Sequence, residues 1–295
     1  MRIVITGADG QLGVELVRAL AVQGEVIGST LTDLDVTDPR CAGRLAALRP
    51  DWVVHAAAAT DVDGCESEPE RAMAVNAEGT RRVAEGCRQA GAGLAYISTD
   101  YVFDGRKGQP YTEEDLPAPL SVYGRSKLEG EHATRALASR WVIIRTAWLY
   151  GTHGRNFVKT ILEKAAAGER LRVVDDQVGS PTYAADLADA VGQMLGRGVT
   201  GLFHVTNSGS CSWFEFAGRI LRLAGAASVP LDRISSAELR RPARRPAYAV
   251  LQDAAWRAAG LPPLRPWPDA LAAMLAALKT VDSSTGGLVN WSQKL

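Results

Sequence analysis

The sequence predicts an α/β protein with a doubly wound parallel sheet and a smaller, partly interleaved α/β lobe. Short apolar runs with the composition of buried strands alternate with segments of helical periodicity through the first half of the 295-residue chain. This alternation is typical of βαβ units whose sheet is covered by helices on both faces. A glycine-rich segment also stands between the first such strand and the first helix, where this fold carries its ligand-binding turn.

The first half of the chain supplies the strands of the sheet in order. The expected strands are residues 3–5, 26–27, 52–54, 94–97 and 141–144, and the helices between them include residues 12–20 and 72–89. A Rossmann-like sheet is complete by about residue 150, so residues 1–150 form the first predicted domain.

The second half is less regular and predicts the smaller lobe. Strands are expected at residues 171–174 and 202–205, helices at 186–195 and 213–224, and two further helices after a Pro/Arg-rich connector at residues 240–246. We expect elements around 171–205 to return to the sheet and the rest of 151–280 to cover its carboxyl edge. Residues 281–295 are rich in Ser and Gly and predict a flexible tail.

Composition excludes several classes of protein. Hydrophobic residues make up 46% and charged residues 22% of the chain, which excludes a disordered protein. Lys plus Arg and Asp plus Glu each total 33, so no net charge favours nucleic acid. No apolar run is long enough to span a bilayer and no secretory signal is visible, so we expect a cytoplasmic protein that binds no membrane. The four cysteines lie far apart and are expected to be reduced thiols without a catalytic role.

The glycine-rich segment is the first functional motif. Gly7, Gly10 and Gly13 recur at every third position, directly after the first strand and at the start of an amphipathic helix. A tight turn, close approach of the backbone to a pyrophosphate, and close packing of helix on strand each require a missing side chain. The motif therefore predicts a dinucleotide whose pyrophosphate lies at the helix N-terminus.

The end of the second strand bears on which dinucleotide binds. An acidic residue there would bind the adenosine ribose diol and reject a 2′-phosphate. The strand instead ends in Gly28-Ser29-Thr30. Asp35 comes later, where it either caps the next helix or contacts the adenine. NADPH is therefore compatible with the sequence, and NADH stays open.

Tyr123 and Lys127 form a second motif. They lie four residues apart at the start of a helical pattern that runs to Leu137, so both side chains project from one face. A phenol with an ordinary pKa near 10 is a poor acid at neutral pH unless a nearby cation stabilises its anion. The pair predicts a proton donor, and the competing interpretation is a surface tyrosine beside a solvated lysine.

Thr99 lies at the carboxyl end of the fourth predicted strand, where open α/β sheets bind their ligands. Its hydroxyl could donate a hydrogen bond to a substrate carbonyl on which negative charge develops. The alternative is a strand-end hydroxyl that bonds only the local backbone. Together, Thr99, Tyr123 and Lys127 predict the reduction of a ketone by hydride and proton.

These motifs and several further segments resemble the dTDP-4-dehydrorhamnose reductases, a family of extended short-chain dehydrogenases/reductases. The similarity covers roughly residues 1–278. Its most specific segments are 56–58, 75–80, 98–105, 145–151, 156–157 and 176–182.

The resemblance implies the reduction of the C4 ketone of a dTDP-4-dehydro-6-deoxy sugar. Tyr123 would protonate the alkoxide, Lys127 would hold the nicotinamide ribose and lower the tyrosine's pKa, and Thr99 would polarise the ketone. The substrate would be bound by Thr99, Asp100, Tyr101, Trp148 and Asn156. The cofactor would be bound by Tyr123 and Lys127 together with Gly7, Gly10, Gln11, Leu12, Gly13, Asp35, Val36, Ala57, Ala58 and Asn76.

Some segments depart from the family pattern. Some members form a dimer around magnesium, and Glu15 matches one ligand, but Ala185 stands where another glutamate would fall. We therefore expect no metal and a monomer or weak homodimer. The arginines at residues 240–245 are either a solvated basic turn or a contact to a nucleotide diphosphate.

Two other functions are kept open. The chain could reduce a different nucleotide-linked 4-keto-deoxysugar, or it could be a regulatory relative without catalysis. Retention of Thr99, Tyr123 and Lys127 argues against the second.

Overall fold

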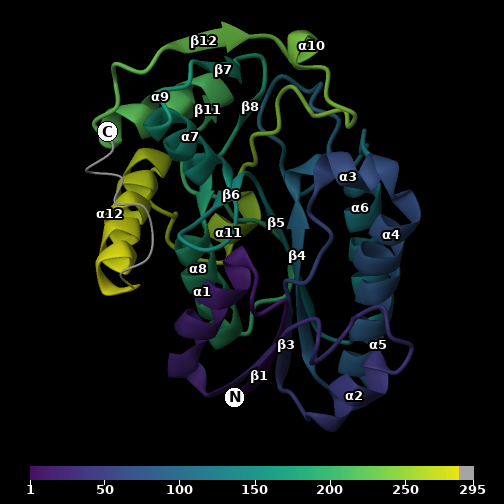
Figure 1. Ribbon diagram of the computed structural model, residues 1–295. Helices are drawn as coiled ribbons and strands as arrows, with labels where there is room; N and C mark the ends of the chain where they lie inside the picture. The colour runs from purple at the N-terminus through teal and green to yellow at the C-terminus, as the bar shows by residue number, and fades with distance from the viewer. Residues whose placement is uncertain (286–295) are drawn as a thin grey trace.

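The structure, a computed structural model, describes residues 1–285 and the side chains of residues 1–280. Its centre is a six-stranded sheet, all parallel, in the order β2-β1-β3-β4-β5-β10 (Figure 1). These strands are β1 (Arg2–Thr6), β2 (Glu25–Ser29), β3 (Trp52–His55), β4 (Gly93–Thr99), β5 (Trp141–Thr146) and β10 (Gly201–His204). The expected doubly wound parallel sheet is confirmed.

Helices cover both faces of the sheet, and the alternation of strand side chains shows how. Ile3 and Ile5 of β1 pack against α1 (Gln11–Leu20) and α8 (Ala184–Arg197). Val4 faces the other way, into a core formed with α2 (Cys41–Ala47) and α5 (Thr80–Ala90). Residues 3–6 of β1 are all buried, which explains the continuous apolar run in the sequence. Helix α6 (Val122–Leu137) lies on the same face as α5.

The strand order reverses between β1 and β3, because the chain places β2 on one side of β1 and then crosses to the other. In open α/β sheets such a reversal leaves a crevice at the carboxyl ends of the strands. The turns that follow β1, β3 and β4 lie at this crevice, and residues of these turns line it.

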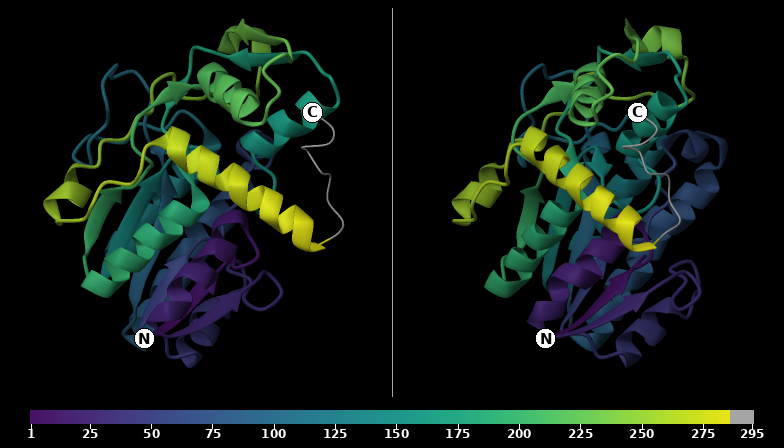
Figure 2. Two further views of the ribbon diagram at one scale, coloured as in Figure 1. Left: turned by 90° about the vertical axis from the view of Figure 1, so that its left-hand side faces the viewer. Right: turned by 60° about the vertical axis from the view of Figure 1, so that its left-hand side comes forward.

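The lobe lies over this edge and has its own core (Figures 1 and 2). Phe216 of α9 (Trp213–Leu223) is fully buried between α7 (Phe157–Ala166) and α12 (Trp267–Thr285). Three two-stranded sheets complete it: β7 (Leu171–Val174) with β12 (Leu231–Ile234), β8 (Val178–Gly179) with β11 (Cys211–Ser212), and β6 (Leu149–Tyr150) with β9 (Thr182–Tyr183).

The returning elements differ in part from the prediction for residues 171–205. Helix α8 and strand β10 do return to the sheet, whereas β7 pairs with β12 in the lobe. The buried side chains Leu171 and Val173 pack into the lobe core. A later segment also returns, because Trp256 of α11 (Ala254–Ala258) packs into the core under β10.

The predicted helix at residues 72–89 is interrupted. It consists of α4 (Pro69–Met73), a π-helical turn η2 (Ala74–Gly79) and α5, and it follows a short helix α3 (Val62–Ser67). Wide π turns of this kind occur frequently at functional sites. Two other short helices, η1 (Ala21–Gln23) and α10 (Ser236–Leu239), lie outside the site.

The C-terminal helix α12 runs to Thr285, so the first residues of the predicted tail at 281–295 are helical, and residues 286–295 lie outside the described part of the chain. Within residues 1–285 no helix combines the length and the apolar character needed to cross a bilayer. All four cysteines are buried free thiols, as expected.

Candidate active site

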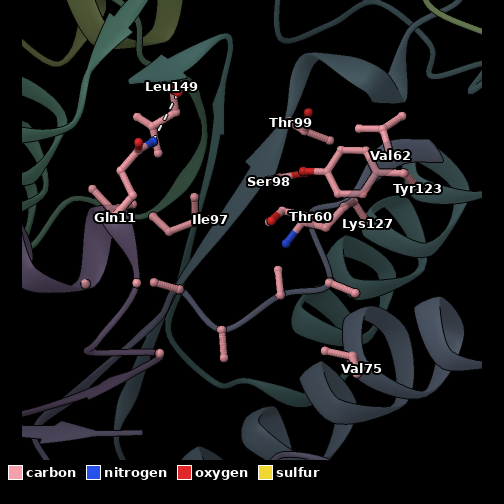
Figure 3. A pocket seen from close by; sticks show the side chains of 18 of the residues that line it. Gln11, Thr60, Val62, Val75, Ile97, Ser98, Thr99, Tyr123, Lys127 and Leu149 are labelled. Atoms are coloured by element: carbon pink, nitrogen blue, oxygen red, sulfur yellow. Dashed lines mark hydrogen bonds between the residues drawn. The ribbon is translucent and has the colours of Figure 1, made fainter. Parts of the chain in front are cut away.

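A cavity of about 990 Å³ opens between the carboxyl edge of the sheet and the lobe. Its walls come from the turns after β1, β2, β3, β4 and β5 and from the starts of α6 and α9. Figure 3 shows Gln11 and Leu149 on one side of the cavity and Tyr123 and Lys127 of α6 on the other. A cavity of this size is appropriate for a cofactor and a small ligand together.

The glycine turn forms a cradle at one end of the cavity. Gly7 has φ +70°, and a Cβ there would lie 2.8 Å from the backbone of Ala57. A Cβ on Gly13 would lie 2.0 Å from the carbonyl oxygen of Gly7. No side chain caps the N-terminus of α1, so no capping group competes for the first N–H groups of the helix, which lie at the cavity. This backbone fits the pyrophosphate of a dinucleotide.

Side chains next to the cradle join the sheet to the lobe. The Gln11 amide donates to the carbonyl of Leu149 at 3.1 Å and accepts from the Asn156 amide at 2.9 Å. Asp35 also lines the cavity, where its carboxylate accepts from the N–H and hydroxyl of Thr37 at 2.8 and 2.7 Å. It therefore closes a turn instead of capping a helix. Leu12, Val36, Ala57 and Ala58 also line the cavity.

Asn76 is the expected cofactor residue that does not line the cavity. It lies on the π turn, fully buried, and its amide bonds both the N–H and the carbonyl of Ala59, at 2.8 and 3.0 Å. It also donates to the Ser126 hydroxyl at 2.9 Å, which in turn donates to the carbonyl of Tyr123. Asn76 therefore fixes the loop after β3 to the helix that carries Tyr123.

Tyr123 and Lys127 lie in the first turns of α6 and point into the cavity toward the end of β4 (Figure 3). The helix begins where Ser121 accepts a hydrogen bond from the N–H of Gly124. Lys127 is 3% exposed, and its ammonium lies 4.2 Å from the centroid of the Tyr96 ring. Burial lowers the pKa of Lys127 to about 7, against the opposing charge of Glu131.

The phenol of Tyr123 stays protonated in this environment. Burial raises the pKa of Tyr123 above its ordinary value, and the Thr99 hydroxyl counteracts part of this shift. The expected lowering of the tyrosine's pKa by Lys127 is thus not what this structure shows, because burial of the phenol dominates. A protonated phenol is nevertheless the form that a proton donor requires.

Thr99 ends β4 beside this pair. Its hydroxyl donates to a carboxylate oxygen of Asp100 at 3.0 Å and accepts from the N–H of Tyr101 at 3.2 Å. Asp100 is 2% exposed, and burial raises its pKa to about 7, although the bond from Thr99 opposes this shift. Tyr101 packs edge-on against Tyr123, with ring centroids 5.4 Å apart.

A buried ion pair lies behind the site. Arg145 of β5 donates two hydrogen bonds to Glu131 of α6, at 2.8 and 2.7 Å, and the Ser98 hydroxyl donates to the same carboxylate at 2.6 Å. Arg145 and Glu131 are 1% and 0% exposed. This network ties β4 and α6, the two elements that carry the predicted catalytic residues, to β5.

The lobe contributes an aromatic wall. Trp148 stacks on Trp213 with centroids 3.6 Å apart, and its backbone has φ +47°, rare for a bulky residue. A Cβ on Gly179 would lie 2.5 Å from the Trp148 ring, so that glycine makes room for the indole. Trp213 and Arg155 line the cavity although no sequence motif marks them. Trp213 is 65 positions from its partner, and only the fold brings them together.

The Arg/Pro-rich connector lies against α3 and Tyr101. Asp63 of α3 accepts from Arg241 at 2.9 Å, from Arg245 at 3.0 and 2.9 Å, and from the N–H of Ala243 at 3.1 Å. These two arginines are therefore paired and not merely solvated. The side chains of Arg240 and Arg244 have no partner among residues 1–280 and line a second cavity of about 530 Å³.

The residues expected around a magnesium ion do not fit a metal. The Glu15 carboxylate is bonded by Arg18 at 3.0 Å and faces the Thr152 hydroxyl at 3.5 Å, and Ala185 offers no ligand oxygen. Within the described residues no group of three His, Cys, Asp or Glu side chains is arranged to hold a metal ion.

The fold and the site define an oxidoreductase of the extended short-chain dehydrogenase/reductase class. Within this class the chain belongs to the family described as the RmlD substrate binding domain, whose model matches residues 1–280.

Curated relatives agree on the kind of enzyme and differ in the sugar. A probable dTDP-4,6-dihydroxy-2-methyloxan-3-one 4-ketoreductase of Streptomyces antibioticus is 46% identical over 276 residues, 92% of this chain and 93% of that protein. The dTDP-4-dehydrorhamnose reductase of Mycobacterium tuberculosis is 45% identical over 283 residues, 94% of this chain and 93% of that protein. The Bacillus anthracis dTDP-4-dehydrorhamnose reductase, solved in complex with NADP, has a TM-score of 0.90 at 38% identity, over 94% of this chain and 99% of that one.

Proposed function

We propose that the protein uses NADPH to reduce the C4 ketone of dTDP-4-dehydro-6-deoxy-L-mannose, which yields dTDP-L-rhamnose. The observation that carries this proposal is the convergence of Thr99, Tyr123 and Lys127 in one cavity with the glycine cradle. A binding module would need the cradle but no aligned proton donor, which argues against a non-catalytic regulatory relative.

The cradle of Gly7, Gly10 and Gly13 would hold the cofactor's pyrophosphate, with Gln11, Leu12, Val36, Ala57 and Ala58 along its length. When bound, the reduced nicotinamide supplies the hydride for the ketone carbon. Lys127 would hold the nicotinamide ribose and place a positive charge near the phenol. The solved complex of the Bacillus anthracis relative contains NADP, which supports NADPH for this chain, and NADH remains a second hydride donor to test.

The chain's own residues then complete the reduction. Thr99 donates a hydrogen bond to the ketone oxygen, which stabilises the negative charge that develops there. Tyr123 gives its proton to the same oxygen as the alkoxide forms. Lys127 lies one helical turn from Tyr123 and lines the same cavity, so its ammonium would offset the charge of the phenolate that remains.

The lobe would hold the sugar nucleotide. Trp148 and Trp213 offer an apolar face to the ring hydrogens and methyl group of a deoxysugar, and Tyr101 and Asn156 flank it. Arg240 and Arg244 have no protein partner and would contact the diphosphate, since a guanidinium matches phosphate oxygens. We propose that the protein acts in the cytoplasm as a monomer or weak homodimer, without membrane or nucleic acid.

Turnover with a defined substrate tests this function. Purified protein, NADPH and dTDP-4-dehydrorhamnose are mixed, and the absorbance of reduced nicotinamide and the NMR spectrum of the product are recorded. We expect oxidation of NADPH and a product with the L-rhamno configuration. Binding of both ligands without turnover would contradict the proposal and favour a regulatory relative.

A second substrate is favoured by one finding, the 46% identity to the Streptomyces antibioticus ketoreductase that is named for a different dTDP-sugar. Thr99 and Tyr123 would contact only the ketone and not the stereocentres of the sugar, so they are compatible with both substrates. Comparison of kcat/KM for the two dTDP-4-keto sugars decides between them.

A further inference from the structure

Asp100 presents an electrostatic problem next to the reacting ketone. Its carboxyl group is buried at the end of β4, between Thr99 and Tyr101, which both line the cavity. One carboxyl oxygen accepts the Thr99 hydroxyl at 3.0 Å, whereas the other, Oδ2, is buried without a hydrogen-bond partner among the described residues. The backbone N–H groups of Asp100 and Tyr101 also act to lower the pKa of this carboxyl, but burial outweighs them, and an ionised carboxylate would keep one buried oxygen without a donor.

No cation resolves this problem. The titratable groups that face Asp100 are two phenols, Tyr101 on the same 3₁₀ turn, η3 (Asp100–Val102), and Tyr123 on α6, and a negative Asp100 would raise the pKa of both. On α6, Lys127 interacts with the Tyr96 ring and with Glu131. Arg245 on the connector acts on Tyr101 and is paired with Asp63. No ion pair joins any of the described cations to Asp100.

The hydrogen bonds of Thr99 make this carboxyl relevant to catalysis. A hydroxyl has one proton, and that of Thr99 is donated to Asp100 in this structure. The Thr99 oxygen already accepts a hydrogen bond from the N–H of Tyr101. To donate to a ketone, Thr99 must withdraw its proton from Asp100, and an ionised Asp100 would then lose its side-chain donor.

Protonation of Asp100 removes this conflict. A neutral carboxyl group can donate its own proton to the Thr99 oxygen, which leaves the Thr99 proton free to point into the cavity. The result is a chain of hydrogen bonds from Asp100 through Thr99 to the ketone, in which no proton leaves Asp100. Burial raises the pKa of Asp100 to about 7, so both forms exist near neutral pH.

We propose that Asp100 is a positioning residue for Thr99, and that the enzyme form with a protonated Asp100 is the one whose Thr99 hydroxyl donates to the substrate. This inference rests on the proposed ketone reduction. It adds a residue that acts through Thr99. The reaction rate then depends on the protonation of Asp100, although Asp100 contacts neither the transferred hydride nor the transferred proton.

The Asp100→Asn variant tests the proposal, because the asparagine amide can donate to Thr99 at every pH. We expect the ratio of its kcat to that of the wild type to rise by about tenfold between acidic pH and one pH unit above the pKa of Asp100. The ratio of the two enzymes at each pH cancels the titration of Lys127, which is present in both. A ratio that is flat or falls with pH would overturn the proposal.

Two companion variants give the controls. Asp232→Asn on β12 makes the same chemical change at a surface ion pair far from the cavity and should follow the wild-type profile. In a Thr99→Ala background the advantage of Asp100→Asn at high pH should disappear, since Asp100 acts through Thr99. An advantage that persists without Thr99 would contradict this route.

A stability measurement separates this inference from the proposed function, because it needs no turnover. The folded protein holds a proton on Asp100 up to about pH 7, whereas the unfolded chain releases it near the ordinary pKa of 3.8. The contribution of Asp100 to the stability of the wild type therefore falls as pH rises between these values, and Asp100→Asn has no such contribution. The difference in unfolding midpoint, variant minus wild type, should increase across that window. A constant difference would show that Asp100 is ionised in the fold and that the proposal is wrong.

Discussion

At the scale of single residues, the site combines groups that burial has pushed toward neutrality. Burial lowers the pKa of Lys127 to about 7 and raises the pKa of Asp100 to about 7. Tyr123 keeps its proton for the same reason again. A cavity that binds a charged cofactor therefore has a reacting end with little net charge of its own, where the charge that develops on the ketone oxygen meets little screening.

Removal of the Tyr123 hydroxyl is the most direct test at this scale. Tyr123→Phe keeps the ring that packs against Tyr101 and removes only the acid. Because general acid catalysis typically contributes about 10²–10⁴-fold, we expect kcat to fall by that factor. Steady-state oxidation of NADPH measures it. Cofactor binding, followed by nicotinamide fluorescence, should be unchanged, and near-normal turnover would show that another group donates the proton.

At the scale of secondary structure elements, α6 has two functions. Its first turns present Tyr123 and Lys127 to the cavity, and one turn later Glu131 forms the buried pair with Arg145. Because these residues recur on one side of the helix, the orientation of the helix that satisfies Glu131 also orients the catalytic side chains. The π turn that carries Asn76 holds the same helix through Ser126.

Loss of the Glu131 charge should destabilise the protein. Glu131→Gln leaves the guanidinium of Arg145 buried without its counter-charge, and breaking a buried pair in this way typically costs about 3–5 kcal/mol. Urea unfolding followed by circular dichroism measures the change. Glu129→Gln is the matched control on the same helix, since Glu129 is 52% exposed in its pair with His132 and should change little. Equal effects of the two variants would argue against a structural role for the buried pair.

How much of the site could be predicted depends on sequence distance. Tyr123 and Lys127 share a helix, so helical periodicity alone places them together, and the glycine turn is defined within seven residues. Trp213 and Arg155 could not be found in this way, because nothing local marks a residue that reaches the cavity from the lobe. Asn76 is buried behind the cavity wall, and the depth of a residue below a cavity leaves no trace in a motif.

At the scale of the whole molecule, the sheet was more predictable than the lobe. The strands of the sheet are continuous apolar runs because both faces are covered. The strands of the lobe have two to four residues, which is too short for a periodic pattern. Strand β7 pairs with β12, 60 residues later in the chain, and not with the central sheet. Such pairing is decided by the packing of Leu171 and Val173 under α9, which the local sequence does not encode.

Cofactor binding should stabilise the whole fold through the glycine cradle. A ligand that binds only the folded state, present at 100 times its Kd, adds about 2.7 kcal/mol. We expect NADPH to raise the unfolding midpoint of the wild type. Gly13→Ala should abolish this rise, because its Cβ would lie 2.0 Å from the carbonyl oxygen of Gly7. Differential scanning fluorimetry with and without NADPH measures both.

Gly43→Ala on α2 provides the control. It adds the same methyl group where no atom lies within 4 Å, in a helix that favours alanine over glycine. It should retain the full rise with NADPH. A normal rise in Gly13→Ala would mean that the dinucleotide binds elsewhere.

The stack of Trp148 on Trp213 has an optical consequence. Two of the seven tryptophans of the chain lie face to face in the cavity wall that a sugar would cover. Indole emission overlaps the absorption of a reduced nicotinamide, so a dinucleotide in the same cavity would quench the tryptophan fluorescence by energy transfer. A sugar against the rings would shift the wavelength of the tryptophan emission. The protein thus carries an intrinsic, label-free reporter that distinguishes the filling of its two ligand sites.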